Sequence, residues 1–311
     1  MNQNPFSKKV KIYTFSAMAL IAAAILLRIL NFLCIYDTTT NYFFEHPLHT
    51  IYRTLCVLTV FWLLSMIVFI PRYAFSTHTA PTPSIFSRSM ALFCALTTLA
   101  SFFFFRDCMQ FYVAHAKLYQ LLATFSLLAA VWFLAQFSDK VPKAPRALIG
   151  YATLIWLGLM LSVTYLNLFV TMNSPFKVTL HLAILSLMLH VLEDARHQVD
   201  RPFRITCYAY TLIAILNCGA ASLPVLLAYL LGLYPNVDYL FYALLMLGFT
   251  VYLCARALDL YRVLMITPPA SPEEIEEDKK KRTEKNQKKK KKANESDEPI
   301  ENEKGDNTHV S

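Results

Sequence analysis

Charged residues are scarce in this sequence. Asp, Glu, Lys and Arg make up 16% of its 311 residues, whereas 56% of the residues are hydrophobic. A soluble globular domain carries about 25% charged residues, so the shortage excludes an ordinary soluble domain. The hydrophobic excess instead indicates a chain that lies in a lipid bilayer.

The sequence also lacks the motifs that mark several enzyme classes. It contains no Walker A loop, no G-x-G-x-x-G, no G-x-S-x-G, no H-E-x-x-H and no C-x-x-C. The classes of ATPase, dehydrogenase, hydrolase and redox protein that carry these motifs are therefore without support. No cofactor and no specific nucleic-acid partner is predicted.

Acidic residues are missing from the middle of every long apolar segment, and the chain has only 6 glycines. A proton-coupled carrier generally needs a titratable group along its path, so this shortage argues against such a carrier. The 7 cysteines show no paired spacing, and we expect no disulfide framework. A single bridge among Cys34, Cys56 and Cys108, which would lie near one membrane surface, is left open.

What the sequence does contain is a series of long apolar segments. Each approaches the ~20 residues that an α-helix needs to cross ~30 Å of hydrocarbon. The expected fold is all-α, a polytopic transmembrane helix bundle at 12–266 that follows an N-terminal segment (1–11) and precedes a disordered charged tail (267–311). Eight transmembrane helices are predicted, at 12–36, 52–72, 86–105, 118–138, 147–171, 175–194, 206–232 and 238–264.

Basic residues near the ends of these helices predict the orientation, because Lys and Arg are retained on the cytoplasmic side during insertion. The loops on the side of the N-terminus hold most of the Lys and Arg that precede the tail. The other side holds only Arg53, Arg106, Lys117 and Lys177. With eight helices, both termini are therefore predicted to be cytoplasmic, in a multi-pass protein of the cell membrane.

The tail has almost no apolar residues and cannot bury enough surface to fold by itself. It carries a Lys-rich block at 279–292, and basic residues near a membrane surface attract anionic lipid with about 1 kcal/mol each. Docking to anionic lipid headgroups or to an acidic protein partner is one interpretation, and a solvated, self-neutralising tail is the other. The basic residues concerned are Lys279, Lys280, Lys281, Arg282, Lys288, Lys289, Lys290, Lys291 and Lys292.

Several ionisable residues gather at the end of the sixth predicted helix. His190, Asp194 and His197 fall within a ~60° arc of one helix face. Imidazole and carboxylate groups on one face suit a metal site in a helix bundle. The same residues, with Glu193 beside them, also suit an ordinary charge network at the membrane boundary, and no second helix carries a matching set.

The eighth predicted helix carries charges near the same boundary. Arg256, Asp259 and Arg262 are spaced at i, i+3 and i+6, and we expect them to pair with Glu193 and Asp194. This inner polar cluster is interpreted either as a static contact that stabilises packing or as the centre of a regulated movement.

Arg28 is the one basic residue well inside a predicted helix. Its side chain leans toward the membrane centre, because helical side chains tilt toward the N-terminus. A buried guanidinium needs a partner, and the candidates are Asp37, Asp107, backbone carbonyls, a lipid phosphate or an anionic ligand.

The seventh predicted helix contains small residues before a proline, from Gly219 to Pro224. Small residues allow close approach of helices, and Pro224 removes a backbone donor. The segment is interpreted either as a hinge or as a kinked packing helix.

The missing signatures favour a non-enzymatic sensor, scaffold or accessory subunit. One alternative is a transporter or permease for a small anionic or amphipathic compound that uses Arg28 and the bend between Gly219 and Pro224. The other alternative is a membrane-embedded metal-dependent enzyme centred on His190, Asp194 and His197.

Overall fold

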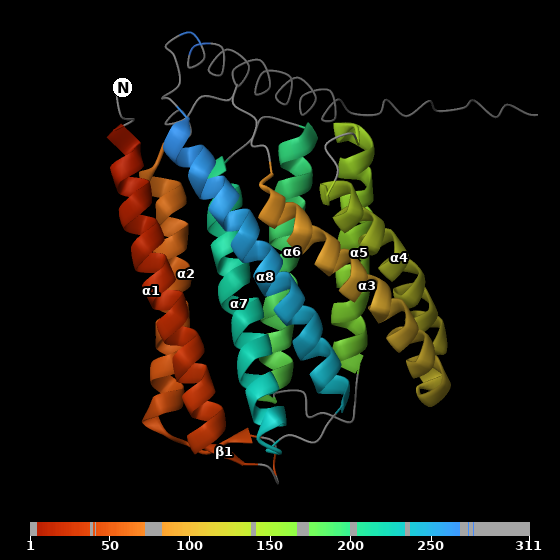
Figure 1. The fold of residues 1–311 in the computed structure, drawn as a ribbon. Helices are drawn as coiled ribbons and strands as arrows, with labels where there is room; N and C mark the ends of the chain where they lie inside the picture. The colour runs from red at the N-terminus through yellow and green to blue at the C-terminus, as the bar shows by residue number, and fades with distance from the viewer. Residues whose placement is uncertain are drawn as a thin grey trace, which may run out of the picture. The chain divides into compact units, whose positions relative to one another are not determined.

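The computed structural model of the protein describes residues 5–37, 40, 42–71, 83–137, 141–166, 174–199, 204–233, 237–267, 273 and 276. Within these residues, eight helices are long and apolar enough to cross a membrane, which confirms the predicted transmembrane bundle (Figure 1). The helices are α1 (Pro5–Cys34), α2 (Pro47–Phe69), α3 (Ile85–Phe111), α4 (Ala116–Phe137), α5 (Lys143–Leu166), α6 (Pro175–Val199), α7 (Arg204–Leu230) and α8 (Val237–Ile266).

The chain divides into two units, Met1–Pro268 and Pro269–Ser311. All eight helices belong to the first unit. Of the second unit, only Glu273 and Glu276 are described, so the predicted disordered tail and its Lys-rich block at 279–292 lie outside the described residues.

Several helices extend beyond the predicted apolar segments. α1 begins at Pro5 rather than at residue 12, α2 begins at Pro47 rather than at 52, and α3 ends at Phe111 rather than at 105. Hydropathy marks only the part of a helix that lies in hydrocarbon. The added part of α1 contains the good helix former Lys, and α2 begins with Pro47 after the N-cap residue His46.

Six of the helices pack in a closed circuit, which we call the six-helix ring. α3 contacts α4, and the contacts continue through α5, α6, α7 and α8 back to α3. The closing contact between α3 and α8 includes stacked rings of Phe104 and Phe241, with centroids 3.8 Å apart. α1 and α2 pack against each other and against α7 (Figure 1).

Consecutive helices run in opposite directions, so the bundle has two ends (Figure 1). We call the end at which α1, α3, α5 and α7 begin the N-terminal end, and the other one the opposite end. At the opposite end, the connection between α1 and α2 forms a hairpin of β1 (Tyr36–Asp37) and β2 (Tyr42–Phe43), in which Tyr36 pairs with Phe43. A 3-10 turn, η2 (Val113–His115), joins α3 to α4.

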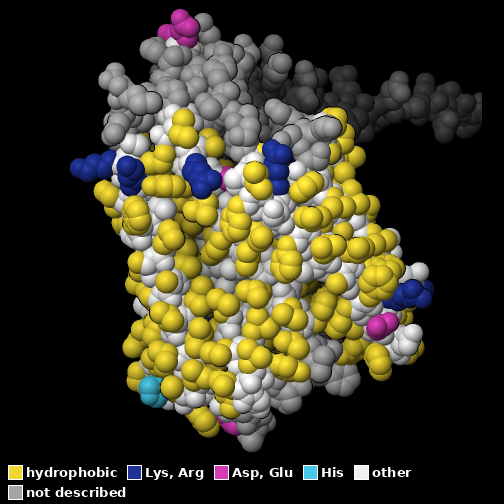
Figure 2. Space-filling view, viewed as in Figure 1, with side chains coloured by type: hydrophobic (Ala, Val, Ile, Leu, Met, Phe, Trp, Pro, Cys, Tyr) yellow, Lys and Arg dark blue, Asp and Glu magenta, His cyan; other side chains and the backbone are white. Residues whose placement is uncertain are grey.

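The outer surface of the helices is apolar. Figure 2 shows hydrophobic side chains over most of the visible face, with Lys and Arg side chains gathered near the end at which α1 begins. Exposed side chains such as Phe61, Val68 and Leu26 contribute to this surface. Soluble monomers rarely expose apolar patches of this extent, and the protein is therefore a multi-pass membrane protein.

All seven cysteines are free thiols. The bridge that the sequence left open among Cys34, Cys56 and Cys108 is not formed. The bundle is held together by packing and polar contacts rather than by disulfides.

Candidate functional site

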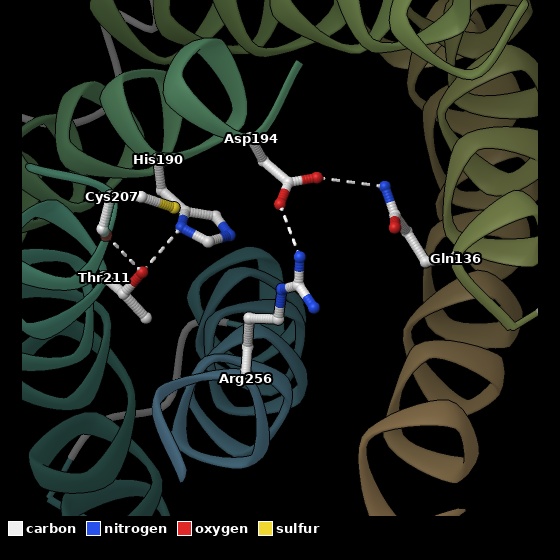
Figure 3. Close-up of polar contacts among 6 residues, drawn as sticks. All are labelled: Gln136, His190, Asp194, Cys207, Thr211 and Arg256. Atoms are coloured by element: carbon white, nitrogen blue, oxygen red, sulfur yellow. Dashed lines mark hydrogen bonds and ion pairs between the residues drawn. The ribbon is translucent and has the colours of Figure 1, made fainter. Parts of the chain in front are cut away.

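A carboxylate inside the six-helix ring bonds to two other helices. Asp194 of α6 accepts a hydrogen bond from Arg256 Nη2 of α8 at 2.9 Å and from Gln136 Nε2 of α4 at 3.1 Å (Figure 3). The Asp194 side chain is 1% exposed and the Arg256 side chain 10%, so the ion pair is buried. Because α4, α6 and α8 alternate around the ring, Asp194 connects three of the six helices across the interior.

His190 lies one helical turn before Asp194 on α6 and contacts α7 instead. Its Nδ1 is 3.0 Å from Thr211 Oγ1, and this hydroxyl donates its only proton to the Cys207 carbonyl at 2.7 Å (Figure 3). Thr211 therefore accepts from His190, which places the imidazole proton on Nδ1. Nε2 carries the lone pair and has no hydrogen-bond partner within the described part of the chain.

We call Gln136, His190, Asp194, Thr211 and Arg256 the interior cluster. Its two α6 residues, His190 and Asp194, share one helix face, since residues four apart lie one above the other on a helix. Buried polar groups need partners of this kind, because an unmade hydrogen bond is costly away from water.

Aromatic side chains pack beside the interior cluster. The ring of Phe133 lies 5.6 Å from that of Phe249 and 5.4 Å from that of Tyr252, and Trp156 lies 6.1 Å from Phe249. All four side chains are at most 1% exposed. Trp156 also donates its Nε1 proton to Ser126 Oγ at 2.9 Å. Large side chains from α4, α5 and α8 thus fill the ring interior at this level.

The structure separates the residues of the predicted inner polar cluster. Arg256 reaches Asp194, but Glu193 pairs with Arg196 on its own helix, with 3.1 Å between Oε1 and Nη1. Asp259 accepts a hydrogen bond from the backbone N–H of Ser84, directly before α3, at 2.9 Å. Arg262 lies 3.9 Å from Asp259 and is largely exposed. Separate contacts, among them one cross-helix ion pair and one helix cap, therefore replace a single inner polar cluster.

The predicted metal site is only partly visible. His190 and Asp194 lie on one face of α6, whereas the side chain of His197 lies outside the described residues. In the part of the chain that is described, no group of three or more His, Cys, Asp or Glu side chains is arranged to hold a metal ion. Since Asp194 already bonds to Arg256 and Gln136, a metal at this site stays a prediction without a geometric argument.

Arg28 lies near the opposite end of the bundle in a separate set of contacts. Its Nη2 donates to the Pro175 carbonyl and to Thr179 Oγ1 of α6, both at 2.8 Å. The guanidinium carbon lies 5.2 Å from the centre of the Phe32 ring, 4.7 Å from that of Phe43 and 5.1 Å from that of Tyr52. We call these six residues the Arg28 cluster. Of the partners that the sequence suggested, the one found is a backbone carbonyl.

Gly219 and Pro224 both lie within α7, which continues through the proline as one helix. A Cβ atom at Gly219 would meet Ile25 Cδ1 of α1 at 2.7 Å, so the glycine lets α1 pack closely on α7. This contact supports the packing interpretation of the segment. Neither residue contacts Arg28 through a hydrogen bond, so a binding region shared by Arg28, Gly219 and Pro224 stays a prediction.

The sequence contained few signs of the partners found in either cluster. Gln136 is one polar residue near the end of an apolar segment, and Thr211 is an ordinary polar residue inside another. A buried Gln in a membrane helix is a usable sign, because its amide needs partners. No protein-family model, curated protein or solved structure matches the chain.

Proposed function

We propose that the protein is a non-enzymatic membrane subunit that acts by binding, as a sensor, scaffold or accessory subunit of a larger assembly. The observation that supports this is Asp194, whose two oxygens bond to α4 and α8 across the interior of the six-helix ring. A conduit for a solute needs a path through its bundle, and this contact crosses the place where such a path would run.

The packing beside Asp194 argues in the same direction. Phe133, Trp156 and Phe249 fill the adjacent level of the ring and are buried. Opening a path there requires parting a buried ion pair, which separates two charges that are shielded from water. We therefore interpret the interior cluster as a static contact that keeps the helices in one arrangement.

The proposed location is the cell membrane, with both termini in the cytoplasm. Support comes from the excess of Lys and Arg at the N-terminal end of the bundle, since such residues are retained on the cytoplasmic side. The Lys-rich block at 279–292 is the proposed contact with anionic lipid headgroups or with an acidic partner protein. Its sequence supports this, because a run of basic residues near a membrane surface is attracted to negative charge.

The test is native mass spectrometry of the protein released gently from its own membrane. A subunit is expected to carry a second polypeptide in fixed ratio. Deletion of 279–292 should release that polypeptide, because it removes the basic block, whereas deletion of 295–306 is a matched control that removes an acidic part of the same tail. Loss of the polypeptide in both variants would contradict the specific role of the basic block.

Measurement of solute uptake tests the alternative function, a permease for a small anion. Proteoliposomes should take up labelled phosphate and acetate no faster than protein-free liposomes. Saturable uptake that disappears in Arg28→Gln, together with a chain that carries no second polypeptide, would replace the proposal with a permease.

A further inference from the structure

We propose that Arg28 and Asn31 form a buried binding site for one oxyanion group, a carboxylate or a phosphate, beneath the β1–β2 hairpin. The site lies near the opposite end of the bundle, between α1, α2 and α6. It is separate from the interior cluster and does not depend on the proposed subunit role.

Arg28 carries a buried charge, and none of the described carboxylates forms an ion pair with it. The residue is 2% exposed, and its two hydrogen-bond acceptors among the described residues, the Pro175 carbonyl and Thr179 Oγ1, are both neutral. Its Nε finds no hydrogen-bond partner among the residues described. Since a guanidinium has five N–H donors and a buried charge is normally paired, the described part of this environment lacks an anion.

The acidic residues at this end do not supply that anion. Asp37 accepts a hydrogen bond from Thr40 Oγ1 at 2.7 Å, and Glu45 and Asp107 are exposed. The side chain of Asp238 lies outside the described residues. Asp37, Glu45 and Asp107 lie at the same end of the bundle as Arg28, but none of the three forms an ion pair with it.

Asn31 also lacks hydrogen-bond partners for its side chain among the described residues, and it follows Arg28 by almost one turn on the same helix face. It is 0% exposed, and neither its amide nitrogen nor its amide oxygen has a hydrogen-bond partner in the described part of the chain. A buried amide without partners is costly in a membrane. Its N–H₂ group is a suitable second donor for an oxyanion held by Arg28.

The electrostatic field at the first turn of α6 also favours an anion beside Arg28. Arg28 binds the first turn of α6, and the N-terminus of a helix carries a partial positive charge that favours anions and disfavours cations. Lys177 adds another cation in the same turn, where its Nζ donates to the Tyr165 carbonyl at 2.8 Å. The helix field and Lys177 disfavour a guanidinium at this place, while the rings of Phe32, Phe43 and Tyr52 attract it. An anion that joins the guanidinium adds a further favourable contact.

One strand of the β1–β2 hairpin covers the Arg28 guanidinium. Phe43 of β2 covers the guanidinium together with Phe32 and Tyr52, which keeps water away and strengthens an ionic contact beneath them.

The experiment is a titration of wild-type protein in phosphatidylcholine nanodiscs with sodium phosphate and with sodium acetate, at constant ionic strength, followed by the melting temperature. A ligand that binds the folded state raises this temperature with saturation. The wild type should show such a rise, and Arg28→Gln should need at least about tenfold more ligand for the same rise, because it loses a charge-assisted hydrogen bond. Arg53→Gln is the matched control, since Arg53 is exposed at the same end, and it should respond as the wild type does.

A second arm identifies the source of the anion. Nanodiscs that also contain phosphatidylglycerol present a lipid phosphate, whereas phosphatidylcholine alone balances its phosphate with a cation. A rise with phosphatidylglycerol but not with free phosphate or acetate, lost in Arg28→Gln, assigns the site to an anionic lipid headgroup. A rise with the free anions assigns it to a small solute.

Two further variants keep the proposal testable if Arg28→Gln fails to fold. Arg28→Lys retains the charge but loses the forked donors, and Asn31→Leu removes an amide without partners in the unliganded protein. Both should bind at least several-fold more weakly, and Asn31→Leu should melt no lower than the wild type without ligand. Equal responses in the wild type and in all folded variants, with any of the anions, would overturn the proposal.

Discussion

Asp194 is the residue on which the interior of the ring depends. It is a carboxylate in an apolar bundle, and its two oxygens are bonded to two different helices. A charge in that position is tolerated only while its partners remain, since the Asp194 side chain is only 1% exposed and water cannot take their place. Arg256 is in the same situation, because its cationic group lies beside the carboxylate.

Removing either partner alone should therefore be much more damaging than removing both. We expect Asp194→Leu and Arg256→Leu each to lower the free energy of unfolding by about 3–5 kcal/mol, and the double variant to lose less than either single one, because it leaves no unpaired charge. Unfolding in mixed micelles of dodecyl maltoside and dodecyl sulfate measures this energy.

Arg262→Leu is the control for that experiment. Arg262 is 65% exposed and lies 3.9 Å from Asp259, so its loss should change the unfolding energy by only about 0–1 kcal/mol. Losses of similar size in the double variant and the two single variants would mean that the ion pair itself does not account for the effect.

At the scale of the helices, Gly150 lets α5 pack closely against α4 and α6. A Cβ atom at Gly150 would lie 3.2 Å from Ala195 Cβ of α6 and 3.2 Å from Trp132 Nε1 of α4. Both distances are shorter than ordinary contacts, so α4, α5 and α6 meet closely at this residue. Gly158, on the same helix, has nothing within 4 Å of a Cβ atom.

Gly150→Val should consequently destabilise the protein by about 1–3 kcal/mol, the usual cost of overpacking a close contact. Gly158→Val is the matched control, because it makes the same change of helix propensity in the same helix. A Gly158→Val variant as unstable as Gly150→Val would show that propensity, rather than contact, sets the effect. Micelle unfolding of both variants measures the difference.

The helices themselves were predictable, because apolar runs of membrane-spanning length leave the backbone few alternatives to a helix. The face shared by His190 and Asp194 was predictable too, since it follows from helical periodicity alone. Their partners were not. Gln136 and Arg256 are 58 and 62 residues from Asp194, and which helices meet is decided by packing that one sequence does not reveal.

For Arg28 the missing information was of another kind. The sequence predicted that it needs a partner, but the Pro175 carbonyl is a backbone group and carries no sequence signal. The helix ends differed from prediction because hydropathy does not record where hydrogen bonding of the backbone stops.

For the whole molecule, the proposed orientation can be tested with its own cysteines. Cys34 is exposed at the end of α1, at the opposite end of the bundle, while Cys254 is exposed within α8, where lipid should surround it. A membrane-impermeant maleimide should label intact cells through Cys34, so that Cys34→Ser abolishes labelling and Cys254→Ser does not. Labelling of Cys34 only in inside-out vesicles would reverse the proposed topology.

The pairing of Asp194 with Arg256 also has a consequence for biosynthesis. Ribosomes add about 5–20 residues per second, so Arg256 is synthesised about 3–12 seconds after Asp194. Gln136 has already been made by then, but it is neutral and cannot balance the carboxylate. A chain interrupted before α8 lacks Arg256, and translation of the last helix is the step that supplies the cation of this buried ion pair.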